Sequence, residues 1–562
     1  MKITGAKIIM ECLLEQEVDT IFGYPGGTII NVYDALYDYS DRIHHILTAH
    51  EQGAAHAADG YARSTGKVGV CLATSGPGAT NLTTGVATAF FDSSPVVFIT
   101  CNVTENVLGK DAFQEVDITG ISMPITKASF MVRSADKIAD TIREAFAVAA
   151  GGRPGPVMID ILKNATSEYA EYETLPKEEH HNRGALRRLA ARGRTELDMA
   201  DLDRLADMIR ASEKPVILAG GGVILSGAHE ELLTLADRLG CPVVNTIMGL
   251  GSIPGTHPHF TGIVGMHGSK ASNFAISRAD LIIAIGTRFS DRVAGHPESF
   301  GAFAQKVHID IDRAEIDKNI LTRHHIIGDA KKVLSALNEK LDQMDFSDWM
   351  AEVDAKRAPY PVPKNTAIDP IAILSSIHDA VGDDVIIATD VGQHQMWACQ
   401  GYPYVRPRQL ITSGGFGTMG FGYGAAMGAK IGNPDRTVVH ITGDGCFRMN
   451  CHEMATAQHY GLPIITVLFN NATLGMVRQW QTLMYSGRYS QTTLDRGPDF
   501  VKLAEAYGLD GYSARTLDEF KAAFQSALES GNGSVIDCRL DIDEKVRPMI
   551  SGGRPLGEYL LD

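Results

Sequence analysis

Short runs of apolar, β-branched residues recur along the chain and alternate with longer segments whose apolar positions follow a helical period. Strands of parallel sheets show such runs because helices cover both of their faces. We expect strands at 68–74, 96–101, 157–161, 215–219, 281–286, 307–311, 385–390, 437–442 and 463–469. These strands fall into three groups, so the pattern predicts an α/β protein of three doubly wound parallel-sheet domains.

Two stretches separate the three groups. Residues 165–200 and 340–368 are rich in charge and poor in periodic apolar positions, and the second also contains prolines. We interpret both as linkers, which predicts domains at 1–170, 195–340 and 368–545 and a C-terminal tail at 546–562. The first and third domains could share a fold without a visible sequence repeat.

Composition narrows the class of protein. The net charge of −16 argues against nucleic acid as a partner, because the phosphate backbone is itself anionic. The N-terminus lacks a secretory signal, and no apolar run approaches the ~20 residues of a membrane span. The eight cysteines are scattered and include no CxxC pair, which indicates reduced thiols rather than disulfides or zinc. We therefore expect a cytoplasmic protein that does not enter the membrane.

The most informative motif is Gly443-Asp444-Gly445, which ends one predicted strand, with Asn471 at the end of the next. Both loops should lie at the carboxyl edge of one sheet. A carboxylate and an amide oxygen suit Mg²⁺ and leave positions for diphosphate oxygens and water. Glycines allow the backbone to approach phosphate, and the following helix contributes N–H groups. Gly-Asp-Gly alone is also an ordinary turn, so the weight rests on its spacing from Asn471.

This spacing resembles the thiamine-diphosphate motif of a known enzyme family. AHEQGAAHAADGYAR (49–63), DVGQHQMWACQ (390–400), TSGGFGTMGFG (412–422) and GMVRQWQ (475–481) further resemble segments of biosynthetic acetohydroxyacid synthases. The resemblance covers essentially the whole chain. It implies decarboxylation of pyruvate and transfer of the hydroxyethyl unit to pyruvate or 2-oxobutanoate, giving 2-acetolactate or 2-aceto-2-hydroxybutanoate for branched-chain amino-acid biosynthesis.

The resemblance also implies cofactors and partners. The cofactors are thiamine diphosphate, Mg²⁺ and a structural FAD, since the overall reaction moves no electrons. The implied assembly is a homodimer or homotetramer with its active sites between chains, joined by a separate small regulatory subunit. The tail would close the site and exclude water.

Particular residues inherit roles from the matched segments. Glu51 would hydrogen-bond N1′ of the aminopyrimidine and so activate the cofactor. Phe113, Gln114 and Lys163 would lie near the reacting centre, Arg292 would bind the substrate carboxylate, and Trp480 would shape the pocket for the second oxo acid. From the residues alone, Glu51 could be a solvated or capping residue, Arg292 an exposed ion pair, and Trp480 a packing anchor.

The predicted binding sets are larger. For thiamine diphosphate they are Pro25, Gly26, Glu51, Val391, Gly392, Gln393, His394, Gly417, Met419, Gly443, Asp444, Gly445, Asn471, Gly475 and Met476, and for the metal Asp444, Asn471 and Thr473. For FAD they are Arg153, Gly220, Gly221, Gly222, Thr246, Ile247, Met248, Met266, His267, Gly268, Gly286, Arg288, Val293, Asp310, Ile311 and Asp329.

Two other functions fit parts of the pattern. A flavin-dependent pyruvate oxidase would share the fold, but Trp480 and Arg292 argue against it. A noncatalytic nucleotide-binding or regulatory protein would have no need of Glu51 together with Asp444 and Asn471.

Overall fold

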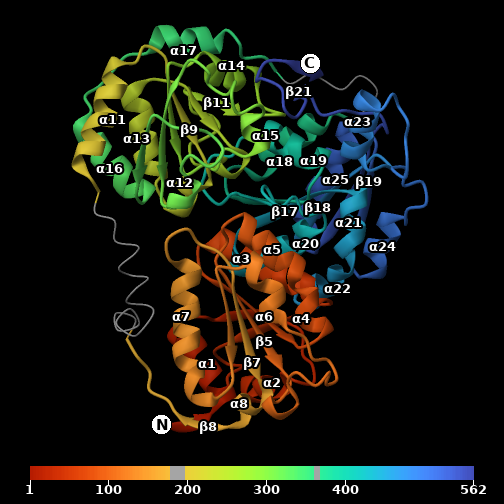
Figure 1. Ribbon diagram of the computed structural model, residues 1–562. Coiled ribbons are helices and arrows are strands. Elements are labelled where there is room, and N and C mark those ends of the chain that lie inside the picture. The colour runs from red at the N-terminus through yellow and green to blue at the C-terminus, as the bar shows by residue number, and fades with distance from the viewer. Residues whose placement is uncertain (177–196, 360–367, 562) are drawn as a thin grey trace.

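The computed structural model describes residues 1–176, 197–359 and 368–561 and contains three six-stranded sheets (Figure 1). Neighbouring strands within each of these sheets are parallel, and helices cover the sheets. The α/β architecture of three doubly wound sheets is thus confirmed. The first domain lies at the bottom of Figure 1, with the middle and third domains above it.

The first sheet has the strand order β3-β2-β4-β5-β7-β6. Its strands are β2 (Thr20–Gly23), β3 (His44–Leu47), β4 (Gly69–Thr74), β5 (Val96–Asn102), β6 (Ala128–Val132) and β7 (Val157–Leu162). Its helices are α1 (Gly5–Glu15), α2 (Ile30–Tyr37), α3 (Glu51–Thr65), α4 (Pro77–Asn81), α5 (Thr83–Phe91), α6 (Ile118–Ser122), α7 (Ile138–Ala150) and α8 (Lys163–Ser167).

The third sheet repeats this topology, with the order β16-β15-β17-β18-β20-β19. Its strands are β15 (Val385–Thr389), β16 (Leu410–Thr412), β17 (Thr437–Gly443), β18 (Ile464–Asn470), β19 (Asp510–Ala514) and β20 (Ser534–Arg539). Its helices are α18 (Pro370–Val381), α19 (Gln393–Gly401), α20 (Phe421–Gly432), α21 (Asp444–Asn450), α22 (Met454–His459), α23 (Gly475–Met484), α24 (Phe500–Ala506) and α25 (Leu517–Ser530). The first and third domains therefore share a fold despite the absence of a visible repeat.

The middle sheet has a different order, β11-β10-β9-β12-β13-β14. Its strands are β9 (Pro215–Ala219), β10 (Val243–Asn245), β11 (Phe260–Ile263), β12 (Leu281–Ile285), β13 (Gln305–Asp310) and β14 (His324–Ile327). Its helices are α11 (Met199–Ala211), α12 (Gly221–Leu225), α13 (His229–Leu239), α14 (Lys270–Arg278), α15 (Asp291–Ala294), α16 (Ala330–Lys340) and α17 (Ser347–Asp354). This is the strand order of dinucleotide-binding sheets, which switch direction between their two central strands.

The expected linkers need correction where the structure describes them. Helix α17 lies within 340–368, and its Trp349 is buried in the core of the middle domain, with the indole N–H donating to the Pro215 carbonyl (3.1 Å). Strand β8 (Tyr169–Glu171) pairs with strand β1 (Lys2–Thr4), so the first domain continues past residue 165. Residues 177–196 of the first expected linker lie outside the described residues, as does the predicted start of the middle domain at 195.

Helices α3 and α20 join the first domain to the third. A Cβ at Gly60 would lie 2.2 Å from the Ala425 carbonyl oxygen, and one at Gly428 would lie 1.8 Å from that of Ala57. Only glycine allows the two helix backbones to approach so closely. Arg63 of α3 adds a buried guanidinium that bonds Asp59 (2.6 Å) and also reaches the third domain at the Thr412 carbonyl (2.7 Å).

The tail joins the third domain to the middle one. Val546 packs in the core of the third domain, whereas Ile550 and Leu556 pack in that of the middle domain. The N–H of Ile550 in β21 (Met549–Ile550) donates to the Met266 carbonyl (2.8 Å). The tail ends in β22 (Tyr559–Leu561), which pairs with β21.

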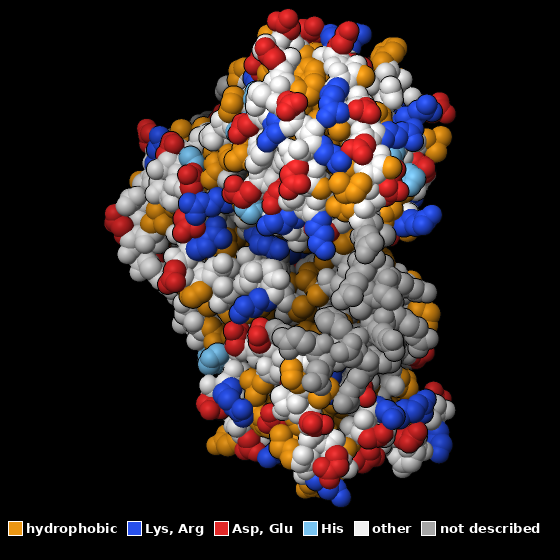
Figure 2. Space-filling model, turned by 90° about the vertical axis from the view of Figure 1, so that its left-hand side faces the viewer, with side chains coloured by type: hydrophobic (Ala, Val, Ile, Leu, Met, Phe, Trp, Pro, Cys, Tyr) orange, Lys and Arg blue, Asp and Glu red, His pale blue; other side chains and the backbone are white. Residues whose placement is uncertain are grey.

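The surface agrees with the charge balance. Figure 2 shows acidic and basic side chains interspersed over most of the visible face. Among the described residues, no helix is both long enough and apolar enough to cross a bilayer.

Candidate active site

Three loops of the third domain converge at the carboxyl edge of its sheet. Asp444 begins α21 directly after β17, and Asn471 follows the neighbouring strand β18. Gln393 begins α19 after β15, on the other side of β17, and its Oε1 accepts a hydrogen bond from Asn471 Nδ2 (3.0 Å). The predicted metal residues therefore meet where β15 and β17 diverge, which is the switch point of this sheet.

Asp444 is a buried carboxylate that lacks compensation. Its Oδ2 makes no hydrogen bond within the described part of the chain, and burial raises the pKa of Asp444 to about 7. His394 Nε2 is likewise buried and unbonded, and burial lowers the pKa of His394 to about 4, so its imidazole is neutral at pH 7. A buried carboxylate oxygen without a partner suits a bound cation, and an unbonded ring nitrogen leaves a polar atom for a ligand. The pair fits a magnesium diphosphate.

The other predicted residues of this half lie around the same loops. A Cβ at Gly475 would lie 2.0 Å from Gln393 Oε1, and one at Gly445 would lie 3.8 Å from Met419. The Thr473 hydroxyl donates to the Thr492 carbonyl (2.8 Å). In the described residues, no three His, Cys, Asp or Glu side chains come together as a metal cluster. A cation here would therefore need oxygens from a diphosphate or water.

Further residues of this set line the same edge. Gly417 lies near Val391, since a Cβ at Gly417 would be 3.9 Å from the Val391 side chain, and Gly392 has a φ of 153°. A Cβ at Gly443 would lie 2.8 Å from His394 Nδ1. Met476 is on α23, where it packs against the core of the third domain.

The tail holds Gln393 in place. Gln393 Nε2 donates to Gln479 Oε1 (3.0 Å) and to the Glu544 carbonyl (2.8 Å), while Gln479 Nε2 donates to the Val546 carbonyl (3.0 Å). The segment that leads into the tail is thus bonded directly to Gln393, and the first tail residue, Val546, is connected to Gln393 through Gln479.

A second group of predicted residues lies at the carboxyl edge of the first sheet. Glu51 is the first residue of α3 and is 9% exposed, and its Oε2 accepts a hydrogen bond from Asn81 Nδ2 (3.0 Å). A Cβ at Gly78 would lie 3.2 Å from Glu51 Oε1, and one at Gly26 would lie 2.5 Å from the Thr74 side chain. The Pro25-Gly26 loop, the 74–78 loop and Glu51 therefore lie together, at the switch point between β2 and β4.

Phe113, Gln114 and Lys163 surround this edge. Gln114 has a φ of 59° and packs behind Gly76, whose added Cβ would lie 2.9 Å from the Gln114 backbone oxygen. Lys163 Nζ donates to the Gly27 carbonyl (2.9 Å). Phe113 is 86% exposed, so its ring has little cover in a single chain.

The two groups remain separate within one chain. Among the described residues, the Glu51 carboxylate makes no hydrogen bond or ion pair to Asp444 or Asn471, and neighbouring residues such as Glu453 connect the two domains. Arg292 is exposed and pairs only weakly with Asp291 (3.5 Å), and Trp480 is partly buried on α23. The family resemblance implies an active site between chains, and these positions within one chain are compatible with two half-sites.

The predicted FAD residues gather at the carboxyl edge of the middle sheet. Gly220 to Gly222 follow β9 and contact Gly286 after β12, because a Cβ at Gly220 would lie 2.2 Å from the Gly286 carbonyl oxygen. Met248 packs beside Gly221, at 3.1 Å from its added Cβ. The glycines line the switch point, where a nucleotide can approach the backbone.

Further FAD residues follow the other strands at the same edge. Thr246 and Ile247 follow β10, and Met266, His267 and Gly268 follow β11. Asp310 is the last residue of β13, and Ile311 comes directly after it. Val293 is on α15, and Asp329 caps α16 after β14. His267 Nδ1 lies 3.1 Å from the Pro548 carbonyl, so the tail also reaches this group.

Two arginines, Arg153 and Arg288, lie at this edge among several carboxylates. Arg153 Nη1 pairs with Glu315 (2.7 Å) and Asp312 (3.3 Å). Burial and the nearby Arg153 lower the pKa of Arg288, and a Cβ at Gly415 of the third domain would lie 2.7 Å from Arg288 Nη2. Arg288, for which the described residues show no ion pair, lies beside this glycine-lined sheet edge, and a guanidinium there fits an anionic dinucleotide.

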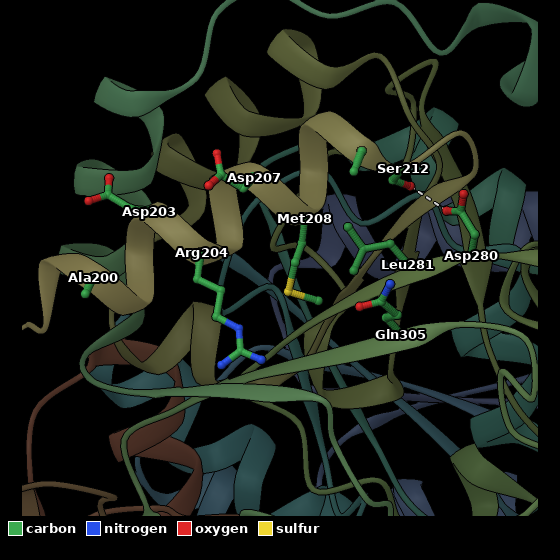
Figure 3. A pocket seen from close by; sticks show the side chains of 10 residues that line it. Ala200, Asp203, Arg204, Asp207, Met208, Ser212, Asp280, Leu281 and Gln305 are labelled. Carbon is green, nitrogen blue, oxygen red and sulfur yellow. Dashed lines mark hydrogen bonds between the residues drawn. The ribbon is translucent and has the colours of Figure 1, made fainter.

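A surface cavity of about 600 Å³ in the middle domain lies apart from the two thiamine-diphosphate groups and from the FAD group. Its lining includes Asp203, Arg204, Asp207 and Asp280, and Asp280 accepts a hydrogen bond from Ser212 (Figure 3). None of the predicted site residues lines it, and its acidic side chains do not suit a phosphate.

Sequence reasoning missed residues that support the half-sites from a distance. Asp92 accepts hydrogen bonds from the N–H groups of Gly414 (3.1 Å) and Gly415 (2.7 Å) and pairs with Arg63 (3.2 Å), so it anchors the loop that carries Gly417. Glu453 contacts the segment before Glu51. No motif in the sequence marks Asp92 or Glu453, because each accepts hydrogen bonds from the backbone of a segment that is distant along the chain.

Comparison with known proteins assigns the chain. Family models of thiamine pyrophosphate enzymes match it three times: the N-terminal TPP binding domain at residues 3–121, the central domain at 202–337, and the C-terminal TPP binding domain at 390–538. A probable acetolactate synthase large subunit of Methanocaldococcus jannaschii is 45% identical over 98% of this chain and 94% of its own length. The chain belongs to the acetolactate synthase large subunit family.

Other members of this family show similar sequence identity to this chain. The acetolactate synthase large subunit of Haemophilus influenzae is 42% identical over 100% of this chain and 98% of its own length. That of Corynebacterium glutamicum is 44% identical over 98% of this chain and 89% of its own length. The family assignment therefore rests on essentially the full chain, as the resemblance predicted.

The uncompensated carboxylate leads to a test of the metal site. Asp444→Asn should weaken binding of thiamine diphosphate with Mg²⁺ by at least roughly tenfold, because it removes the one anionic ligand. Calorimetric titration measures this, with Asp435→Asn, an exposed change in the same domain, as the matched control. Equal affinity of Asp444→Asn and the control would exclude Asp444 as a ligand.

Proposed function

We propose that this protein is an acetolactate synthase that decarboxylates pyruvate on thiamine diphosphate and transfers the hydroxyethyl unit to a second 2-oxo acid. The observation that carries the proposal is the pair of half-sites. One presents a buried glutamate at the start of a helix, and the other presents an uncompensated aspartate beside an asparagine. Family membership makes thiamine diphosphate the molecule that joins them.

Thiamine diphosphate, when bound, supplies a carbon that adds to the carbonyl of a 2-oxo acid and accepts the electrons released with carbon dioxide. Glu51 would hold the proton at N1′ of the aminopyrimidine, and Asn81 keeps its carboxylate oriented. Asp444, Asn471 and Thr473 would hold Mg²⁺, and His394 would lie beside the diphosphate. Residues of the tail would exclude water from the reacting centre.

A second copy of the chain is part of the proposal. Within one chain the Glu51 side chain does not bond Asp444 or Asn471, and large apolar side chains are exposed on the first and third domains, among them Phe113, Met123, Phe416, Met449 and Met484. A homodimer that places Glu51 of one copy against Asp444 of the other would cover such side chains and complete each site. A homotetramer and a separate small regulatory subunit remain further expectations of the family resemblance.

The choice of second substrate is a finer proposal. Trp480 and Met476 lie on α23, which begins directly beside Gln393 and Asn471. A partly buried indole there can line the pocket for the second oxo acid, and Arg292 can bind its carboxylate through a fork of donors. We therefore include 2-oxobutanoate beside pyruvate, which places both products in branched-chain amino-acid biosynthesis in the cytoplasm.

FAD is proposed as a structural cofactor of the middle domain. The glycine-lined switch point and Arg288 support a dinucleotide there, as argued above. The overall reaction is redox-neutral, so flavin would contribute stability and shape instead of electrons.

The activation role of Glu51 predicts a product result. With pyruvate, thiamine diphosphate, Mg²⁺ and FAD, the wild-type protein should form acetolactate, and it should form acetohydroxybutyrate when 2-oxobutanoate is added. Glu51→Gln should lower the rate by about 100-fold or more, because the amide is a poor proton acceptor. Chromatographic product analysis measures both, with the exposed Glu505→Gln as control. Oxidation of pyruvate to acetate by the wild type, with no acetolactate, would contradict the proposal and favour an oxidase.

The flavin proposal has its own test. Arg288→Met should weaken FAD binding by about tenfold or more, since it removes a charged donor from a partly buried anion site. Fluorescence titration of the flavin-free protein measures this affinity, and Arg278→Met, an exposed change in the same domain, should have no effect. Wild-type protein that binds no FAD under these conditions would refute the proposed site.

A further inference from the structure

The start of helix α3 is held by a carboxylate of the third domain. Glu453 ends the short 3₁₀ helix η6 (Cys451–Glu453), directly after α21, and is fully buried. Its Oε2 accepts a hydrogen bond from the N–H of Ala49 (3.0 Å), and its Oε1 accepts one from the N–H of His50 (3.1 Å). The Thr456 hydroxyl also donates to Oε2 (2.6 Å), which fixes the carboxylate.

These two bonds act on the backbone immediately before Glu51. The N–H groups at a helix start have no partners inside the helix and need acceptors. The His50 ring accepts a hydrogen bond from the N–H of Gln52 (3.1 Å). Glu453 accepts from the N–H groups of Ala49 and His50. Since the backbone at residues 49 and 50 determines where the Glu51 side chain begins, Glu453 determines the position of the Glu51 carboxylate.

Gly53 in the first turn of α3 makes room for this contact. A Cβ at residue 53 would lie 1.9 Å from Glu453 Oε1. Glycine is a poor helix former, so its place in this turn brings no benefit to the helix itself. Close approach of the Glu453 carboxylate accounts for it.

Joining the two domains does not require a carboxylate here. Within the described residues, no lysine or arginine forms an ion pair with Glu453. His452 Nε2 is 3.8 Å away, and burial lowers the pKa of His452, so that imidazole is mostly neutral at pH 7. An apolar side chain would hold the domains at a smaller desolvation cost. The carboxylate has the additional property of holding two adjacent N–H groups in a fixed geometry.

We propose that Glu453 is a positioning residue for cofactor activation, and that it acts only through the placement of Glu51. The proposal rests on the activating role proposed above for Glu51. Displacements of about 1 Å at a catalytic group can lower a rate by about 100-fold. Loss of the two amide bonds should therefore slow proton removal from the cofactor without weakening the cofactor's diphosphate contacts.

The test measures activation without substrate. Exchange of the C2 proton of bound thiamine diphosphate into D₂O, followed by NMR after acid quenching, should slow by about tenfold or more in Glu453→Gln. The carboxamide would turn an NH₂ group toward one of the two donors. The affinity for thiamine diphosphate with Mg²⁺, measured by calorimetry, should stay within about twofold of wild type. Backbone hydrogen exchange at Ala49 and His50 should accelerate in the cofactor-free protein.

A second variant and a double mutant separate positioning from loss of folding. Gly53→Ala should reproduce the slow C2 exchange because its methyl group displaces Glu453, although alanine favours the helix. In the Glu51→Gln background, adding Glu453→Gln should slow the exchange no further. The exposed Glu505→Gln should match wild type in every measurement.

Wild-type exchange in both Glu453→Gln and Gly53→Ala would overturn the inference, as would a further slowing on top of Glu51→Gln. Unchanged exchange in Glu51→Gln alone would remove the premise and overturn it too. Wild-type protein that exchanges C2 normally but makes no acetolactate would refute the carboligation, while the predicted effects of Glu453 on exchange would still support its positioning role.

Discussion

The backbone contact between helices α3 and α20 is the constraint on which the rest of the structure depends. Gly60 and Gly428 let the helices approach until a Cβ on either would overlap a carbonyl group of the other helix. This contact fixes the first domain against the third within one chain. Within this arrangement the Glu51 carboxylate bonds Asn81 and the Asn471 amide bonds Gln393, so the two groups do not bond each other directly.

The two half-sites differ in how well their buried polar atoms are hydrogen-bonded within one chain. Asp444 and His394 retain buried, unbonded polar atoms, which a single chain does not satisfy and a magnesium diphosphate would. Glu51, in contrast, is already oriented by Asn81 and, through the backbone, by Glu453. In the proposed function, the chain thus orients its activating carboxylate in advance and leaves the proposed cation site to be completed by its ligand.

The sequence predicted the parts of the fold that depend on local pattern. Long buried strands such as β5 and β18 were recognised within one residue at each end, because their apolar runs are uninterrupted. The three-residue strands β10 and β16 were missed, since such short runs have no distinguishable period. Helix α17 was missed because charged residues surround Trp349, whose burial depends on contact with β9.

The same division applies to the candidate site. Asp444, Asn471 and Glu51 could be selected because loops after parallel strands meet at one edge, and because their segments resemble a known family. Glu453, Gly53 and Asp92 could not, since each depends on an approach between segments far apart in sequence. A site shared between chains was implied only by the family resemblance, because the pattern of residues carries no information on which chain supplies each loop.

Subunit complementation tests the central claim, that each active site forms between two copies. Glu51→Gln and Asp444→Asn proteins are each expected to be nearly inactive. Chains mixed after dissociation should pair at random, so half of the dimers contain one of each, and each mixed dimer has one intact site of two. The mixture should therefore recover about one quarter of wild-type acetolactate formation. No recovery in a mixture shown to contain mixed dimers would contradict the account and place the whole site within one chain.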